Sequence, residues 1–545
     1  MKKLLIFAAA IFLLPFLSVK GNPSANPEES QVPSRSANAN SQAVYKPEYI
    51  SPTPGKFPII ASSPVSDGRK PTRFDYFILS DCGFNAAMTI FNTAQYLPLM
   101  SEIKDLDLTL LPILDNYTPL MARDTIEYIR EYMNANDIPY SMIGGYRVKD
   151  EPAYRNMKDI SDLHAAIKQA DPDVMPFVNL AAQPNKDFKP NAPQRSYSVD
   201  STARRNMSAY FNHFYESVHP DVWSYDYYPF VYHSQGDTLV VNYADFYYNL
   251  QLFARMSKEK GIPFWAYCQA TNVRFIKIGE PNYTEHPEAT EANLRYEAFN
   301  ALAFGAKAIT YWRYSDREDA PHPDTAGTSY EHYISSLTDK YGRQRRAWRA
   351  AEKVNKEILR HENLFMNTEL LSYSLLGDTA ALLGKEHYVR PTYGADIPEY
   401  DGHISIRKSS GPGFLVSSLK EGEHFVTFIV NQSPTDSTTF IMSHPVDLVK
   451  ILMVENEHAD SLHGLISSVS NPIFHESGPI MKPNFPLDPF EPAYKSSMPW
   501  YVRLAPAGYM IIEYDYISPE NTSGKNGDNE QNAGPKMVAT LKDNV

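Results

Sequence analysis

The chain has little cysteine and lacks the histidine patterns of metal sites. Its 545 residues include two cysteines, Cys82 and Cys268, too few for a disulfide framework or a four-thiolate metal centre. Both lie in apolar segments, so we expect buried free thiols, with one disulfide as the alternative. No H-x-H or H-E-x-x-H pattern, Walker A sequence or Rossmann glycine fingerprint occurs, so we expect neither a metal nor a cofactor.

The chain is also short of positive charge. Lys and Arg number 51 against 64 Asp and Glu, a net charge of −13, which speaks against nucleic acid or an anionic membrane as the main partner. Hydrophobic residues make up 43% and charged residues 21%, values that exclude a fully disordered chain and a polytopic membrane protein. Tyrosine is abundant instead, with 37 residues against 5 Trp.

The N-terminal segment has the pattern of a secretory signal peptide over residues 1–21. Lys2 and Lys3 precede an apolar run from Leu4 to Val19, and small residues follow. The run is short for a membrane span and contains Pro15, so we expect cleavage and no span in the mature protein. Cleavage removes three lysines and no acidic residue, which takes the net charge from −13 to −16. We expect a periplasmic or extracellular protein.

Two segments have the composition of linkers. Residues 22–56 contain six prolines among Ser, Asn and Gln, and residues 517–545 are too polar to bury a core. We therefore expect a disordered linker before the folded part and a disordered tail after it.

Between these segments, short apolar runs alternate with amphipathic helical intervals. Ile126, Ile129 and Met133, for example, follow the i, i+3, i+7 spacing of one helix face. Strand and helix repeats imply parallel strands, and eight such units predict a (β/α)8 barrel over residues 57–362. The eight runs are FPIIAS (57–62), FNAAMTI (84–90), LTLLPIL (108–114), YSMIGGYRV (140–148), VMPFVNL (174–180), VWSYDYY (222–228), PFWAYC (263–268) and KAITYW (307–312).

The pattern changes after residue 362. Short alternating runs such as HFVTFIVN and YMIIEYDY are separated by Gly, Pro, Asp and Ser turns. This pattern is typical of antiparallel strands, and we expect a β-sandwich over residues 363–516.

Carboxylates, amides and aromatic rings gather where the barrel strands end, which is where the active sites of such barrels lie. Cleavage of a glycosidic bond needs two carboxyl groups, and aromatic faces suit the binding of sugar rings. The candidates are Asp150 and Glu151 after the fourth run, Asn179 in the fifth, Asp226 and Tyr228 in the sixth, Trp265 and Gln269 in or after the seventh, and Trp312 in the eighth.

These residues resemble the superfamily of (β/α)8 glycoside hydrolases over roughly residues 57–340. The run LRYEAFNALAFGAKAITYW, from Leu294 to Trp312, is similar to the helix and eighth strand of secreted bacterial glycosidases. The resemblance implies an acid/base glutamate at the end of the fourth strand, which matches Glu151, and a tryptophan beneath the sugar, which matches Trp312. It also implies a nucleophilic glutamate at the end of the seventh strand.

The seventh strand departs from that pattern because it ends in Gln269, and a neutral amide cannot attack the sugar carbon. Three alternatives stay open. Asp226 supplies the second carboxylate; or one of the glutamates in the loop 280–291 does; or the barrel binds a glycan without cleaving it. The loop glutamates are Glu280, Glu285, Glu288 and Glu291.

We therefore predict a secreted glycoside hydrolase that acts on a neutral glycan, with Glu151 as general acid and Asp226 as second carboxylate. The residues predicted to contact the substrate are Asp150, Asn179, Tyr228, Trp265, Gln269 and Trp312. The competing prediction is a non-catalytic glycan-binding barrel. A third prediction is a structural adhesion protein.

Overall fold

The computed structural model describes residues 51–66, 68–90, 93–182, 201–317, 322–323, 329–377, 390–391, 393–444, 449–455, 459–463 and 500–516. The predicted signal peptide, the predicted tail and most of the predicted linker lie outside these residues. The last linker residues, 51–56, are described and turn against the barrel, where the Pro52 carbonyl faces Gly144. Within the described part of the chain, no helix has the length and apolarity needed to cross a membrane.

Eight parallel strands close into a barrel in the order β1-β12-β9-β6-β5-β4-β3-β2, which confirms the predicted (β/α)8 fold. Closure is direct, because β1 pairs with β2 on one side and with β12 on the other. Each strand coincides with one of the eight apolar runs. The strands are β1 (Ile59–Ser62), β2 (Ala86–Ile90), β3 (Thr109–Ile113), β4 (Gly145–Asp150), β5 (Met175–Ala181), β6 (Trp223–Asp226), β9 (Phe264–Gln269) and β12 (Ile309–Trp312).

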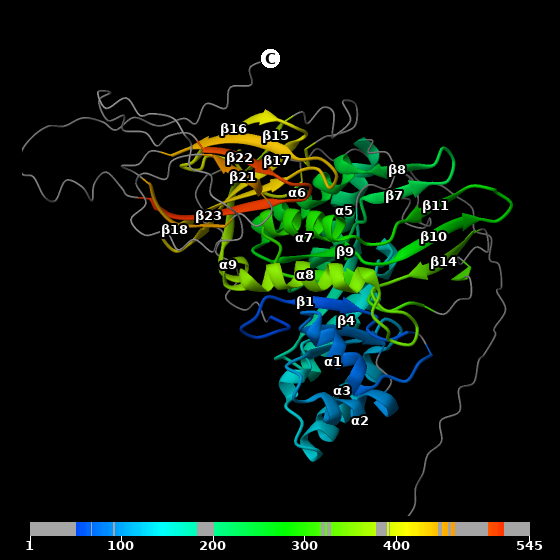
Figure 1. Ribbon diagram of the computed structural model, residues 1–545. Coiled ribbons are helices and arrows are strands. Elements are labelled where there is room, and N and C mark those ends of the chain that lie inside the picture. The colour runs from blue at the N-terminus through cyan, green and yellow to red at the C-terminus, as the bar shows by residue number, and fades with distance from the viewer. Residues whose placement is uncertain are drawn as a thin grey trace, which may run out of the picture. The chain divides into compact units, whose positions relative to one another are not determined.

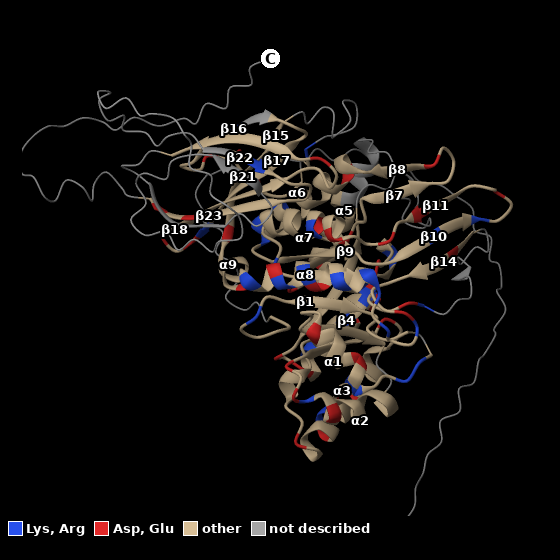
Figure 2. Ribbon diagram, viewed as in Figure 1, with Lys and Arg blue, Asp and Glu red and all other residues tan. Residues whose placement is uncertain are grey.

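A helix follows each barrel strand and covers the outside of the barrel (Figure 1). The amphipathic spacing decides which side packs inward: α8 buries Trp348 and Val354, while Arg346, Arg349 and Lys353 face solvent (Figure 2). The helices are α1 (Arg73–Asp81), α2 (Thr93–Ile103), α3 (Pro119–Ala135), α4 (Met157–Ala170), α5 (Ser201–Val218), α6 (Tyr243–Lys260), α7 (Glu291–Ala303) and α8 (Arg346–Arg360), with a short α9 (Glu362–Asn367) behind them.

The barrel interior is a packed core and not a channel. Side chains that point inward, among them Met88, Leu111, Phe177 and Trp265, form one buried cluster. The cysteines Cys82 and Cys268 are both free and buried, as predicted. The interior therefore supports a site only at the ends of the strands.

Three excursions from the barrel, after β6, β9 and β12, pair into one six-stranded antiparallel sheet that the sequence did not predict (Figure 1). All three leave from the carboxyl ends of barrel strands, so the sheet stands at the end of the barrel that carries the candidate residues. Its order is β13 (His322–Pro323), β14 (Ser329–Ser335), β10 (Asn272–Lys277), β11 (Tyr283–His286), β7 (Phe230–His233) and β8 (Thr238–Val241).

The C-terminal part is antiparallel, as predicted, and forms two sheets. Side chains from both sheets, such as Val416 and Phe440, share one hydrophobic cluster. Tyr509 stacks on Phe299 of α7 with 3.9 Å between the ring centroids, which joins this part to the barrel. One sheet contains β15 (Glu369–Gly377), β17 (Gly413–Glu421), β18 (His424–Asn431), β23 (Tyr509–Tyr516) and β20 (Val449–Glu455); the other contains β16 (Ser405–Ser410), β19 (Thr438–Ser443), β22 (Trp500–Leu504) and β21 (Ala459–His463).

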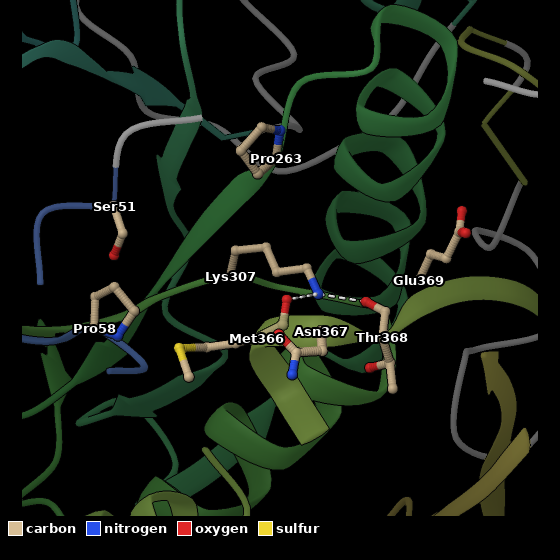
Figure 3. A pocket seen from close by; sticks show the side chains of 8 residues that line it. All are labelled: Ser51, Pro58, Pro263, Lys307, Met366, Asn367, Thr368 and Glu369. Atoms are coloured by element: carbon tan, nitrogen blue, oxygen red, sulfur yellow. Dashed lines mark hydrogen bonds between the residues drawn. The ribbon is translucent and has the colours of Figure 1, made fainter. Parts of the chain in front are cut away.

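A pocket of about 330 Å³ lies beside the amino ends of β1, β9 and β12, opposite the candidate residues (Figure 3). Lys307 reaches across it and donates to the carbonyls of Phe365 at 2.8 Å, Met366 at 3.2 Å and Thr368. These carbonyls lie at the end of α9 and just beyond it, where a helix has no internal donor. Burial lowers the pKa of Lys307 to about 8. We assign this lysine a structural role, in keeping with the stabilising function of this end of a barrel.

Candidate active site

Three neighbouring strands bring two aspartates and one asparagine together. Asp150 ends β4, Asn179 pairs with it in register on β5, and Asp226 ends β6. Asn179 Nδ2 donates to Asp150 Oδ1 at 3.0 Å and to Asp226 Oδ1 at 2.9 Å, so 5.9 Å is the upper limit for the distance between the two oxygens. The Ser224 hydroxyl donates to Asn179 Oδ1 at 3.0 Å and thereby fixes the orientation of the amide.

Asp226 has an environment that favours its protonated form. Its side chain is half-buried, and burial together with repulsion from Asp150 raises its pKa from 3.8 to about 7. The Asn179 amide and the Tyr228 hydroxyl act in the opposite direction. A carboxyl group with a pKa near 7 both gives and takes a proton at neutral pH, which is the property that general acid and base catalysis requires.

A buried arginine joins this group from the middle of β4. Arg147 Nε and Nη2 donate to the two carboxylate oxygens of Asp115 at 3.1 and 2.9 Å, and Nη1 lies 3.4 Å from Asp150 Oδ2. Burial opposes the charge on Arg147, but Asp150 and Asp115 outweigh it and raise the arginine pKa. Burial also raises the pKa of Asp115, against the influence of Arg147. Arg147 therefore places a fixed positive charge beside Asp150.

Glu151 follows Asp150 at the end of β4 and is exposed. Its φ of 38° lies in the left-handed region, which is rare for a residue other than glycine, and its backbone N–H donates to the Asn179 carbonyl at 2.8 Å. The charge of Glu151 contributes to raising the pKa values of Tyr210 and Tyr228, after the larger effect of their burial. The side chain thus borders the same end of the barrel as the two aspartates.

Gln269 ends β9 without adding a carboxylate. The side chain is only 2% exposed, its Nε2 donates to the Pro287 carbonyl at 3.3 Å, and its Oε1 has no partner among the residues that the structure describes. Its backbone N–H donates to Glu297 of α7 at 3.0 Å, and burial raises the pKa of Glu297 well above its usual value. The seventh barrel strand therefore offers an amide to a ligand.

Three of the glutamates that follow β9 form ion pairs elsewhere. Glu285 lies 2.5 Å from Arg274. Glu291 pairs with both Arg295 and Lys353, and Glu280 lies 3.5 Å from Lys277. The fourth, Glu288, is exposed. Asp150 is, in contrast, the carboxylate whose charge acts on Asp226.

Aromatic rings border the site on the side of the six-stranded sheet. Tyr228 and Trp312 stack with 5.0 Å between their centroids and 22° between their planes. His286 of β11 meets the edge of Tyr228 at 5.5 Å, and Tyr333 of β14 meets Trp312 at 6.0 Å. Both rings of the central pair are partly exposed, so they offer faces on which the C–H surface of a sugar can stack.

A family model described as beta-galactosidase, that of glycoside hydrolase family 42, matches residues 170–361. The matched segment runs from the end of α4 to the end of α8 and includes Asn179, Asp226, Gln269 and Trp312. The match supports a similarity to the (β/α)8 glycoside hydrolases. The resemblance noted in the sequence is confirmed at that level.

The solved structures to which this chain is similar are distant in sequence, and the comparison with curated proteins gave no match. Endo-β-1,4-mannanase from Thermotoga petrophila has 11% identity and a TM-score of 0.34, with 72% of this chain and 96% of the mannanase covered. The cold-adapted β-galactosidase from Rahnella sp. R3 has 9% identity and a TM-score of 0.38, with 59% of each chain covered. Xylanase 10B from Thermotoga maritima has 14% identity and a TM-score of 0.32, with 56% of this chain and 96% of the xylanase covered.

Seven of the eight residues predicted for the hydrolase site lie at the carboxyl ends of the strands or directly after them, and Trp265 does not. Trp265 is fully buried in the barrel interior, 5.1 Å from the ring of Phe177. Its place is in the core beneath the site, and we assign it no contact with substrate. The other seven are Asp150, Glu151, Asn179, Asp226, Tyr228, Gln269 and Trp312.

Sequence reasoning missed Arg147 and the two rings from the six-stranded sheet. The sequence contains one indication of Arg147. A charged residue within the run YSMIGGYRV needs a partner inside the barrel. His286 and Tyr333 had none, since the pairing of β11 with β7 and of β14 with β10 is long-range. Within the described ranges, no three His, Cys, Asp or Glu side chains gather in a way that suits a metal ion.

Proposed function

We propose that this protein is a glycoside hydrolase that cleaves O-glycosidic bonds of a neutral glycan, and that Asp226, in place of the predicted Glu151, is the group that carries the proton. The observation that carries the proposal is the Asp226 carboxyl, with a pKa near 7, hydrogen-bonded through Asn179 to Asp150. Glycosidases need one carboxyl group that holds a proton and a second that is ionised. Burial favours the proton on Asp226, whereas Asp150 faces the guanidinium of Arg147.

The charge of the site supports a neutral substrate. With Asp226 protonated, the carboxylates of Asp115, Asp150 and Glu151 still outnumber the cations Arg147 and Lys149, so an anionic sugar would meet repulsion. The stacked pair of Tyr228 and Trp312 offers aromatic surface of the kind that binds uncharged sugar rings. The description of the matching family makes β-galactosides the first substrates to test.

Two further parts of the proposal concern the rest of the chain. The apolar run after Lys2 and Lys3 supports export, to the periplasm or the cell exterior, after cleavage of residues 1–21. The shared core of the two C-terminal sheets supports their interpretation as a β-sandwich that braces the barrel through α7. Cell fractionation and N-terminal sequencing of the mature protein test the first part.

The test of the function is hydrolysis of a panel of nitrophenyl glycosides and neutral polysaccharides. We expect turnover by the wild-type protein and a loss of at least about 10²-fold in Asp226→Asn on substrates with poor leaving groups, since the variant has no proton to give. Asp173→Asn is the matched control, because this exposed aspartate precedes β5 at the opposite end of the barrel. Full activity in Asp226→Asn contradicts the assignment of the proton donor.

The alternative is a barrel that binds glycans without cleaving them, and the observation that favours it is Gln269 in place of a carboxylate. Calorimetry on the same glycans separates the two. Binding by the wild-type protein without turnover on any member of the panel supports the alternative and contradicts the proposed hydrolysis.

A further inference from the structure

We propose that Asp150 is the nucleophile of this barrel, that Asp226 is its acid/base partner, and that hydrolysis proceeds with retention of anomeric configuration. The inference rests on the proposed function, because it names the second carboxyl group of that reaction. The superfamily resemblance implies a nucleophilic glutamate at the end of the seventh strand. The proposal assigns the nucleophile instead to an aspartate at the end of the fourth strand.

The shared hydrogen-bond donor places the two carboxyl groups around one small space. Asp150 Oδ1 and Asp226 Oδ1 accept hydrogen bonds from one nitrogen and lie at most 5.9 Å apart. Both groups can therefore act on one glycosidic bond. Retention follows from the role given to Asp150, because attack by a carboxylate and then by water inverts the anomeric carbon twice.

The surroundings of Asp150 suit an ionised and accessible group. Its Oδ1 accepts from the Asn179 amide, and its Oδ2 faces the guanidinium of Arg147 at 3.4 Å. Its side chain remains 46% exposed, so a sugar carbon can approach it. Arg147 is in turn held by both oxygens of Asp115, which makes it a positioning residue for the carboxylate.

Glu151 is the neighbouring carboxylate that has to be distinguished from Asp150. Its backbone is tied to the Asn179 carbonyl, in a left-handed conformation that ends the strand. Asp150 Oδ1 and Asp226 Oδ1, in contrast, accept hydrogen bonds from the same nitrogen, Asn179 Nδ2. Glu151 thus borders the site, and Asp150 and Asp226 form the pair.

The reaction balances with these two groups and water. The Asp226 carboxyl gives its proton to the glycosidic oxygen while the bond from that oxygen to the anomeric carbon breaks, and the electron pair stays on the leaving oxygen. An Asp150 oxygen forms the new bond to the anomeric carbon from the opposite face. Water then attacks that carbon, the Asp226 carboxylate takes a proton from the water, and the electron pair of the ester bond returns to Asp150. Two inversions give net retention.

The experiment compares Asp150→Ala with Glu151→Ala on a 2,4-dinitrophenyl glycoside of the sugar that the wild-type protein hydrolyses, with and without sodium azide. This leaving group needs no proton, so the assay reports on the nucleophile alone. We expect Asp150→Ala to lose at least about 10³-fold in turnover, to regain activity with azide, and to release a glycosyl azide of inverted configuration. We expect no azide rescue in Glu151→Ala and no glycosyl azide among its products.

Asp150→Asn, which preserves the shape of the side chain, repeats the test if the alanine variant does not fold, and Asp173→Ala is the control for a lost carboxylate. Azide rescue of Glu151→Ala instead, or a first product of inverted configuration in ¹H NMR of the wild-type reaction, overturns the assignment of Asp150 while leaving glycoside hydrolysis intact. Absence of any turnover by the wild-type protein overturns the proposed function itself.

Discussion

Asn179 holds two carboxyl groups together that repel each other when both are ionised. Its amide donates to both, and Ser224 fixes the amide from behind. Asp226 lies in the more buried position, and Asp150 faces Arg147, so the proton is favoured on Asp226 and the charge on Asp150. The chemistry proposed for the site follows from this difference between two residues of the same type.

The pH dependence of stability tests this difference without a substrate. Asp226 has a folded-state pKa of about 7 against an ordinary value of 3.8, so between these pH values the folded state keeps a proton that the unfolded state loses. Its contribution to stability is therefore complete below about pH 4 and is lost as the pH rises to 7. The groups that face Asp226 are Asp150, Asn179, Tyr228 and Tyr267.

In Asp226→Asn this titration is absent, and the Asn179 amide still finds an acceptor oxygen. We expect the melting temperature of the variant, relative to wild type, to rise steadily from pH 4 to pH 7. Asp173→Asn serves as the control and is expected to show a flat difference. A flat difference for Asp226→Asn as well would mean that Asp226 is ionised like an exposed aspartate.

At the scale of elements, the site depends on excursions as much as on barrel strands. The strands β10, β11 and β14 present Val273, His286 and Tyr333 on one face of the six-stranded sheet, since these three residues are paired in register. The ring of His286 contacts Tyr228, and the ring of Tyr333 contacts Trp312. The sheet thereby fixes the aromatic side of the site.

The opposite end of the barrel supplies the element-scale prediction. Lys307 gives hydrogen bonds to three carbonyls at the end of α9, and these acceptors lose their donor in Lys307→Met. We expect the free energy of unfolding to fall by about 2 kcal/mol, measured by denaturant titration, with little effect on turnover. Lys158→Met, which alters a lysine that is 81% exposed on α4, is the control. Equal midpoints for the two variants would contradict the structural role of Lys307.

For the whole molecule, the barrel was predictable because most strands are near-continuous apolar runs and several of the intervals show helical spacing. Parallel strands buried on both faces leave that signature in the sequence. The six-stranded sheet left no such signature, since β8 and β11 are only four residues long and β11 mixes charged, polar and aromatic residues. Two of its strand pairings, β11 with β7 and β10 with β14, also join residues about 50 or more apart in the chain, as Tyr232 with Glu285.

The candidate site was predictable to the level of residues, but not to the level of roles. Position after a strand identified Asp150, Glu151, Asn179 and Asp226, since the carboxyl ends of parallel strands meet at one end of a barrel. Burial and the position of Arg147 decide which carboxyl group holds the proton. Neither can be read from the sequence pattern around each residue. Trp265 shows that the sequence does not give the depth of a side chain in the barrel. An inward-facing ring belongs to the core when it lies below the strand ends and to the site when it lies at them.

The central claim is that Asp150 and Asp226 form the catalytic pair, and the most direct measurement is the identity of the residue that the sugar modifies. The wild-type protein is incubated with the 2-deoxy-2-fluoroglycosyl fluoride of the hydrolysed sugar, digested and sequenced by tandem mass spectrometry. The account predicts one fluoroglycosyl group on Asp150. A fluoroglycosyl group on Glu151 or any other residue, or an active enzyme that forms no adduct, would contradict it.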